Sequence, residues 1–280
     1  MSSNLEEQIL SELLDELEKD QLVLPTLPEV ALRIRESIED DNSSTASITK
    51  VIGTDAALTA KLLQIANSAL LRANREIETL DAAINRMGRK MLRNVVNSII
   101  VQQMFQATTD VTDKRLRALW EHSAQVAAIS HALARFAKLQ PDEALLAGLI
   151  HDVGALPILT KAEDVPELLK DVEMLDRIIN KLHSRIGAAI LKKWNFPEEL
   201  IAVAAEHENL LRDTGSHADY VDVVIAANLQ SYMGTNHPHA NMDWSDVPAF
   251  NKLGLSPEIS VIEMDEVGED IKEVQQALLS

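Results

Sequence analysis

Helical periodicity with almost no interruption is the feature that most constrains the fold of this chain. Leu, Ala, Ile and Glu dominate, no stretch alternates apolar and polar residues as a half-buried strand does, and aromatic residues make up only 3%. Short breaks rich in Pro, Gly, Asn, Asp and Ser separate the helical segments, as helix ends require. They lie at residues 24–29, 40–45, 106–114, 139–143, 195–199, 212–219 and 234–241. The sequence therefore predicts an all-α fold.

The break at residues 106–114 predicts a division into two helical parts. Residues 1–108 would form an N-terminal helical bundle, and residues 109–280 a second helical domain with additional C-terminal helices. The segment after residue 242 is acidic but keeps apolar residues at helical spacing, which is typical of packed terminal helices. We expect the N-terminal bundle to pack on the second domain.

Charge limits the partners that this chain can have. The net charge is −18, from 44 acidic and 26 basic residues, so a phosphate backbone is repelled on average. The main exception is a basic stretch with Arg86, Arg89, Lys90 and Arg93. We interpret it as a cationic helix face that pairs with acidic groups of this chain or of an acidic partner. We therefore expect no binding to nucleic acid.

Composition also predicts where the protein is found. The first residues carry acids where a secretory signal carries bases, and no run approaches the apolar length of a membrane span. The chain has no cysteine, which excludes disulfides, thiolate metal ligands and a cysteine nucleophile. We expect a cytoplasmic protein that does not bind membranes.

Histidines on apolar helix faces are the candidate functional residues. Three of them fall on such faces: His122 with Val126, Ile129 and Leu133; His183 with Ile186, Gly187 and Ile190; and His207 after Val203 and Ala204. One inward histidine is more often an ordinary core residue than a ligand. Three from separate helices, together with the adjacent pair His151-Asp152, predict a shared polar pocket.

Imidazole and carboxylate groups from several helices can bind zinc, manganese, iron or nickel. Such a metal lowers the pKa of bound water and stabilises a phosphoryl oxygen. The order of His122 and His151-Asp152 resembles the HD superfamily of metal-dependent phosphohydrolases, which has a histidine, a His-Asp pair and a final aspartate on different helices. The resemblance implies that His183 and His207 correspond to further histidine ligands of its cyclic-dinucleotide phosphodiesterase branch.

The final acidic position of the superfamily is altered in this chain, which reads Ala227-Asn228-Leu229. The amide of Asn228 is neutral, so the ligand set would hold one negative charge where active members hold two. Asp219 and Asp222 lie on other faces of the same helix. Glu208, which follows His207, stands where the phosphodiesterase branch has a second histidine.

We therefore interpret the metal site as vestigial or weak, holding either no cofactor or a weakly bound divalent metal. Its ligand set would be His122, His151, Asp152, Asn228, His183 and His207.

The N-terminal part carries a more specific resemblance. It contains Leu-Pro-x-Leu-Pro, followed by a helix with Asp55, Leu58, Leu62, Leu63, Ala66, Asn67 and Ser68. Together with the stretch at residues 77–96 and the spacing of Trp194 and Pro197, this pattern resembles the HDOD family over about residues 20–240. That resemblance implies an N-terminal helical bundle packed on an HD-like helical domain, an often incomplete metal motif and a role in bacterial signalling.

Several of these motifs have a structural interpretation. Pro25 and Pro28 fix an extended entry to a helix, and Asn67-Ser68 ends a helix by bonding to backbone groups. Leu58, Leu62 and Leu63 form a core stripe, and Trp120, Trp194 and Trp244 are packing anchors. His237 and His239 are interpreted as solvated residues of a polar loop.

Two functions remain open from the sequence. In the first, the chain is a non-catalytic signalling or scaffold module with a protein partner, and its pocket stabilises the fold or binds a small ligand such as a nucleotide. In the second, it is a metal-dependent phosphohydrolase with His151 and Asp152 as catalytic residues. Asn228 favours the first, and the sequence leaves the oligomeric state open.

Overall fold

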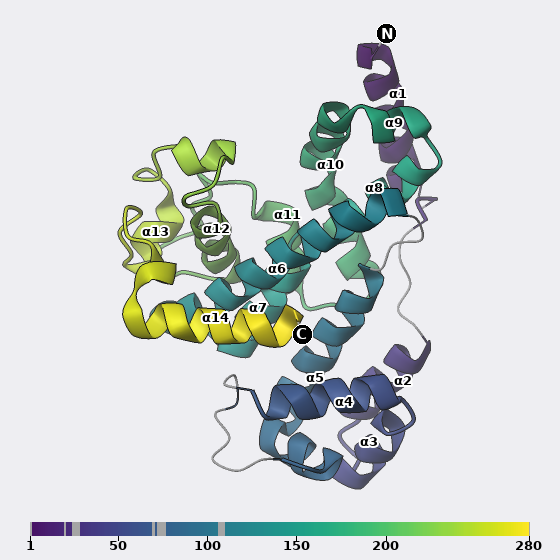
Figure 1. The fold of residues 1–280 in the computed structure, drawn as a ribbon, viewed down its shortest axis with the longest axis vertical. Coiled ribbons are helices and arrows are strands. Elements are labelled where there is room, and N and C mark those ends of the chain that lie inside the picture. The colour runs from purple at the N-terminus through teal and green to yellow at the C-terminus, as the bar shows by residue number, and fades with distance from the viewer. Residues whose placement is uncertain are drawn as a thin grey trace.

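The predicted all-α fold is confirmed. The computed structural model describes residues 2–19, 21–23, 29–68, 71, 77–105 and 110–279, and every regular element within these ranges is helical (Figure 1). The Leu-Pro-x-Leu-Pro motif with Pro25 and Pro28 lies outside the described residues. The elements are α1 (Ser2–Glu18), α2 (Glu29–Glu39), α3 (Thr45–Ile52), α4 (Ala56–Ala66), α5 (Leu80–Met104), α6 (Asp110–Ala137), α7 (Pro141–Ile150), α8 (Ala155–Glu163), α9 (Pro166–Lys170), α10 (Val172–Lys193), α11 (Glu198–Glu206), α12 (Tyr220–Ser231), η1 (Pro238–Asn241), α13 (Pro248–Leu253), η2 (Val261–Glu263) and α14 (Asp265–Leu279).

The first hydrophobic core is formed by α2, α3, α4 and most of α5, which make the lower lobe in Figure 1. Ser44, Asp55 and Thr79 cap the starts of α3, α4 and α5, each side chain accepting a hydrogen bond from a backbone N–H three residues later. Leu58 and Leu62 are buried in this core. These contacts confirm the core stripe that the sequence predicts.

Asn67 ends α4 and ties it to the start of the next segment. Its Nδ2 donates to the carbonyl oxygens of Leu63 and Ile77, both at 2.9 Å, and its Oδ1 accepts from the backbone N–H of Ile77 at 2.7 Å. Ser68 Oγ donates to the carbonyl of Ile65 at 2.8 Å. The helix-ending interpretation of Asn67-Ser68 is therefore confirmed, and Asn67 uses both atoms of its amide in doing so.

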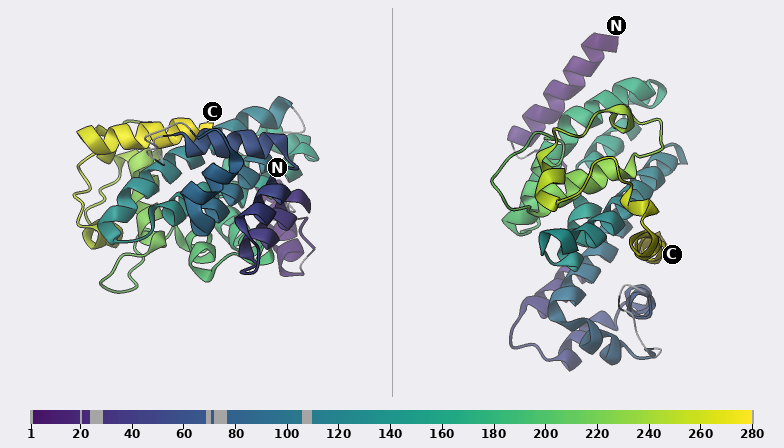
Figure 2. Two further views of the ribbon diagram at one scale, coloured as in Figure 1. Left: turned by 90° about the horizontal axis from the view of Figure 1, so that it is seen from below. Right: turned by 90° about the vertical axis from the view of Figure 1, so that its left-hand side faces the viewer.

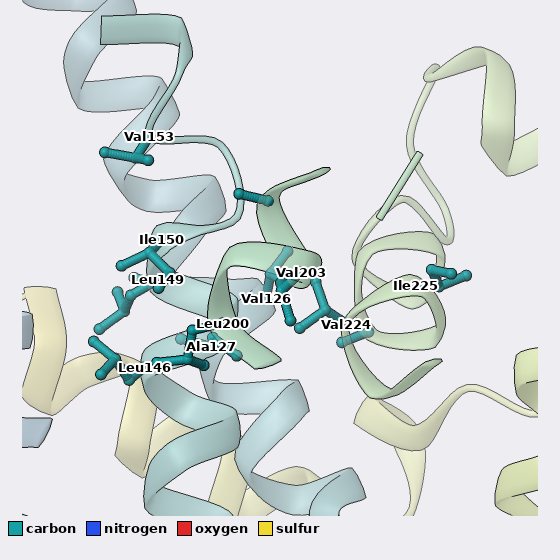
Figure 3. Packing of buried hydrophobic residues seen from close by; sticks show 14 of the residues in the cluster. Val126, Ala127, Leu146, Leu149, Ile150, Val153, Leu200, Val203, Val224 and Ile225 are labelled. Atoms are coloured by element: carbon teal, nitrogen blue, oxygen red, sulfur yellow. The ribbon is translucent and has the colours of Figure 1, made fainter. Parts of the chain in front are cut away.

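The second and larger core contains helices α6 to α12. Figure 3 shows side chains of α6, α7, α11 and α12 packed together, among them Val126, Ile150, Val203 and Val224. α14 lies along α6, and α1 packs on α10 at the opposite end (Figure 2). The C-terminal segment is thus a set of packed helices, as predicted.

α1 belongs to the second core although it opens the chain. Ile9 and Leu13 are buried in the same hydrophobic cluster as the residues of α6 and α10. The division of the chain at residue 108 remains a prediction. That division places α1 in the N-terminal part, whereas its buried residues pack in the second core.

α5 and one arginine connect the two cores. α5 bends at Gly88, whose φ of 68° is accessible to glycine at little cost, and then continues to Val101 and Phe105 in the second core. Arg35 of α2 donates to the carbonyl of Trp194 at 2.5 Å and to that of Asn195 at 3.1 Å, where α10 ends. A cation at this place also complements the negative end of the helix dipole.

The basic stretch binds groups of the chain itself. Arg89 donates to the backbone carbonyls of Ile38, Asp40 and Ser43, and Lys90 forms a salt bridge of 2.8 Å with Glu143. These contacts agree with the interpretation of this stretch as an internally paired cationic face.

The most apolar segment of the described residues is Pro141–Glu163. By length and composition it could cross a membrane, but 83% of its most apolar window is buried inside the structure. It consists of α7, a turn and α8, so it is a core segment that the rest of the protein covers. Trp120, Trp194 and Trp244 are also buried, as expected of packing anchors.

Replacing Arg35 with Ala should weaken the connection between the two cores. The carbonyls of Trp194 and Asn195 would lose a charged donor, and we expect the free energy of unfolding to fall by about 2 kcal/mol in urea denaturation. Arg33→Ala on the exposed face of the same helix is the control and should change it by less than about 0.5 kcal/mol. Equal losses in the two variants would contradict this role of Arg35.

Candidate metal centre

The His/Asp pocket contains all six residues that the sequence predicts: His122, His151, Asp152, His183, His207 and Asn228. They come from α6, the turn after α7, α10, the end of α11 and α12. Apart from His122 and Asp152, which keep a small exposed fraction, all are buried. The apolar stripes thus direct each side chain inward, as expected.

Asp152 lies between two groups of histidines. Its Oδ2 is 3.4 Å from His151 Nε2 and 3.9 Å from His122 Nε2. Its Oδ1 is 3.2 Å from His207 Nε2 and 3.4 Å from His183 Nε2. One carboxylate therefore faces two potential cation positions, one on each oxygen.

Backbone carbonyls fix the tautomer of three histidines. Nδ1 of His151 lies 2.7 Å from the carbonyl oxygen of Gly148, Nδ1 of His183 lies 2.8 Å from that of Ile179, and Nδ1 of His207 lies 3.0 Å from that of Val203. A carbonyl only accepts, so each Nδ1 must carry the proton. Each neutral ring therefore directs the Nε2 lone pair toward Asp152, which is the arrangement that metal-binding histidines adopt.

Four polar atoms in the pocket are buried and have no hydrogen-bond partner among the described residues. They are His122 Nε2, His151 Nε2, Asp152 Oδ1 and Asn228 Oδ1. Nε2 of His183 and Nε2 of His207 lie 3.1 Å apart, although with protonated Nδ1 atoms neither neutral ring has a hydrogen to donate. The pocket is therefore rich in acceptors and requires a positive charge, supplied by a proton or a cation.

Electrostatics shows which group takes a proton when no cation is bound. Burial lowers the pKa of His151 to about 3 and also lowers the pKa of His122, so both are neutral at pH 7. Burial opposes ionisation of Asp152, but the nearby histidines outweigh it and hold its pKa well below the usual value. Burial likewise opposes protonation of His207, but contact with Asp152 raises its pKa overall. His207 is thus the proton acceptor of the pocket.

The donor set fits a divalent transition metal. One group consists of His122, His151 and Asp152, the other of Asp152, His183 and His207, and within each group the ligand atoms lie within 4.8 Å of one another. Imidazole nitrogen with carboxylate oxygen suits zinc, manganese, iron or nickel. His151 and His207 also stand at the C-terminal ends of α7 and α11, where the helix dipole favours a cation.

The two aspartates at the start of α12 bond to groups outside the pocket. Asp219 caps the start of α12 and pairs with Arg212 at 2.8 Å, and Asp222 pairs with Lys252 at 3.1 Å. Glu208 approaches more closely, with its Oε1 3.6 Å from His207 Nε2 and its side chain 41% exposed. Glu208 is therefore the carboxylate beside the pocket that could contribute charge.

Two glycines that the sequence gave no reason to single out bring the helices to this pocket. A Cβ at Gly148 would lie 2.6 Å from Ala127 Cα, and a Cβ at Gly154 would lie 1.9 Å from the carbonyl oxygen of His183. Gly148 thus permits the close approach of α7 to α6. Gly154 permits the turn after Asp152 to lie directly on α10.

Three stacked rings cover one side of the pocket. Tyr232 stacks on His122 with ring centroids 5.3 Å apart, and His237 stacks on Tyr232 at 3.6 Å. The interpretation of His237 and His239 as solvated is wrong, since both are partly buried. The loop after α12 folds back, because Tyr232 offers an apolar ring face at the end of that helix.

The profile of the HDOD domain matches residues 24–210 of this chain, more than half of its length. The chain belongs to the HDOD family. The resemblance of the N-terminal motifs to this family is thereby confirmed.

Known proteins similar to this HDOD chain include two solved structures. A candidate metal-dependent phosphohydrolase from Shewanella amazonensis SB2B is 30% identical, with a TM-score of 0.86, over 98% of this chain and 99% of its own. An HDOD domain protein with unknown function from Geobacter sulfurreducens is 23% identical, with a TM-score of 0.66, over 97% of both chains.

A curated relative, an uncharacterised protein of Treponema pallidum, is 27% identical over 74% of this chain. The chain spans less than half of that relative, 42% of its length.

Replacing Gly154 with Ala should distort the pocket. The new Cβ would overlap the His183 carbonyl, and we expect a loss of about 3 kcal/mol in the free energy of unfolding. Gly187→Ala, whose Cβ would meet its nearest neighbour at 3.3 Å, is the matched control and should cost about 1 kcal/mol or less. Gly154→Ala with the stability of wild type would show that this close approach is not required.

Proposed function

We propose that this chain is a regulatory HDOD protein that acts by binding a protein partner or a small ligand, and that its His/Asp pocket binds a divalent cation weakly without turning over phosphoesters. The observation that supports cation binding is the contact between Nε2 of His183 and Nε2 of His207 at 3.1 Å, beside the Asp152 carboxylate. Both nitrogens are acceptors in the neutral rings, so their contact is unfavourable. Protonation of His207 removes this repulsion, and a bound cation would remove it as well.

The weakness of the site follows from its charge. Asp152 is the carboxylate among the six proposed ligands, and Asn228 contributes only a neutral oxygen. A second carboxylate ligand would neutralise more of the charge of the cation, so it would lower the pKa of metal-bound water less than a neutral ligand does. It would, however, bind the cation more tightly. Because Asp219 and Asp222 bond elsewhere, the cation would depend on Glu208 for further charge. Loss of affinity is therefore the main expected effect of Asn228.

The residues of the chain have separate roles in this proposal. His122 and His151 would hold a cation on the Oδ2 side of Asp152, and His183 and His207 on the Oδ1 side. The carbonyls of Gly148, Ile179 and Val203 orient three of the rings. A bound metal supplies positive charge and polarises an oxygen ligand. The stack of Tyr232 and His237 on His122 restricts access from one side.

A second function is favoured by one specific observation. The three residues His122, His151 and Asp152 converge with unpaired nitrogens, as a phosphohydrolase of the HD superfamily requires. The similar Shewanella protein described as a candidate metal-dependent phosphohydrolase supports the same reading. In that case His151 and Asp152 would be catalytic through the metal that they hold.

Metal binding and turnover separate the two functions. We expect wild type to bind Mn²⁺ weakly in calorimetry and to leave bis(p-nitrophenyl) phosphate intact. Asn228→Asp should bind Mn²⁺ at least about tenfold more tightly, because it adds a charge next to His122. Asn251→Asp, an exposed site on α13, is the control for added charge and should leave the affinity unchanged. Manganese-dependent turnover by wild type that His151→Ala abolishes would establish the second function instead.

Mn²⁺ affinity should depend on pH through His207. Its pKa is raised, so in the metal-free pocket the proton is held at low pH and released as the pH rises. The cation must displace that proton, and the affinity should therefore fall by up to about tenfold per pH unit below the pKa of His207. His207→Gln should lack this dependence. An affinity independent of pH in wild type would show that His207 is not the group that the cation displaces.

A further inference from the structure

A second cavity, the junction pocket, lies where the two hydrophobic cores meet. It has a volume of about 100 Å³ and is lined by α2 and α5 on one side and by α7, the start of α11 and the start of α12 on the other. Its lining residues include none of the six residues of the His/Asp pocket. The junction pocket is therefore a separate feature of the fold.

Part of its polar lining is already paired. Arg35 uses its guanidinium on Glu39, Trp194 and Asn195, and it lies over the Phe196 ring at 5.5 Å. Glu143 accepts from Tyr220 and forms a salt bridge with Lys90. These groups build the walls of the pocket and are satisfied by the protein.

Two side chains of α5 in the pocket form no hydrogen bond with the described residues. Asn97 is 8% exposed, and no described residue forms a hydrogen bond with its amide. Arg93 is partly buried and forms neither a hydrogen bond nor a salt bridge with any described residue, although its charge helps to lower the pKa of Glu143. Asn94, between them in sequence, uses only its Nδ2, on Asp142 at 3.3 Å. Asn97 follows Arg93 by four residues and Asn94 by three, so it neighbours both on the helix surface, and all three line the pocket.

We propose that the junction pocket binds a small monocarboxylate that also carries an amide group. The planar guanidinium of Arg93 matches a carboxylate, and the amides of Asn94 and Asn97 offer a donor and acceptors to a ligand amide. The lining also contains Glu39, Glu143 and Glu199. Their negative charge disfavours a more highly charged anion such as a phosphate dianion.

Arg93 and Asn97 contribute little to the fold when no ligand is bound. Because neither side chain forms a hydrogen bond with the described residues, an apolar side chain of similar shape removes no such bond. Arg93→Met and Asn97→Leu should therefore keep or raise the melting temperature of the ligand-free full chain. A purely structural role for either residue would instead lower it.

Binding is tested by calorimetry on the full chain with succinamate, asparagine and glutamine, each up to about 10 mM. We expect at least one of these to bind and to raise the melting temperature. Arg93→Met and Asn97→Leu should weaken that binding by at least about tenfold, the loss expected for a hydrogen bond to a charged group. Chloride and inorganic phosphate serve as anion controls and should not bind comparably.

Arg33→Met is the matched charge control, since Arg33 is exposed on α2 and does not line the pocket. It should leave the affinity unchanged. The proposal would be overturned by the absence of binding for all three compounds, by equal losses in Arg33→Met and Arg93→Met, or by equal binding of inorganic phosphate. It would also be overturned if Arg93→Met and Asn97→Leu both lowered the melting temperature of the ligand-free chain.

Discussion

The hydrogen bonds from three imidazole Nδ1 atoms to backbone carbonyls are the constraint on which the site depends. They fix His151, His183 and His207 with their Nε2 lone pairs directed at Asp152. Each carbonyl belongs to the same helix as its histidine or to the turn next to it, so local helical geometry sets the ring orientation. The packing of the helices then brings the three oriented histidines and Asp152 together. The result is a pocket of acceptors around one carboxylate, which is stable only with a positive charge inside it.

The junction pocket and the His/Asp pocket lie toward opposite ends of the same three helices. α7 carries Glu143 near its start and His151 at its end, α11 carries Glu199 and His207, and α12 carries Tyr220 and Asn228. In each case eight residues separate the two positions, which is about 12 Å along a helix. The packed helices that form the wall of the junction pocket are therefore the ones that position the ligands of the His/Asp pocket. A shift of one of these helices at either end changes the geometry of both.

The sequence could predict the direction of each histidine because apolar residues three and four positions away mark the buried face of a helix. The same geometry correctly placed Asp219 and Asp222 away from Asn228. Asn67 was identified as a helix end for another reason, the tendency of short polar side chains to bond to nearby backbone groups. Tertiary features gave no such signal. Gly154 meets the carbonyl of His183, far along the chain, and the stack of His237 on Tyr232 depends on how a loop folds back. The packing of α1 with the second core and the position of Arg93 in the junction pocket also follow only from the assembled helices.

Neutral rings in the pocket present acceptors, and His207 carries the compensating proton when no cation is bound. Long-range ¹H–¹⁵N correlation spectra of the metal-free, histidine-labelled protein test this assignment directly, because they report which ring nitrogens are protonated. At about pH 6 we expect His151 to be neutral with its proton on Nδ1, and His207 to be protonated on both nitrogens. A proton on Nε2 of neutral His151, or a neutral His207 at that pH, would contradict the account.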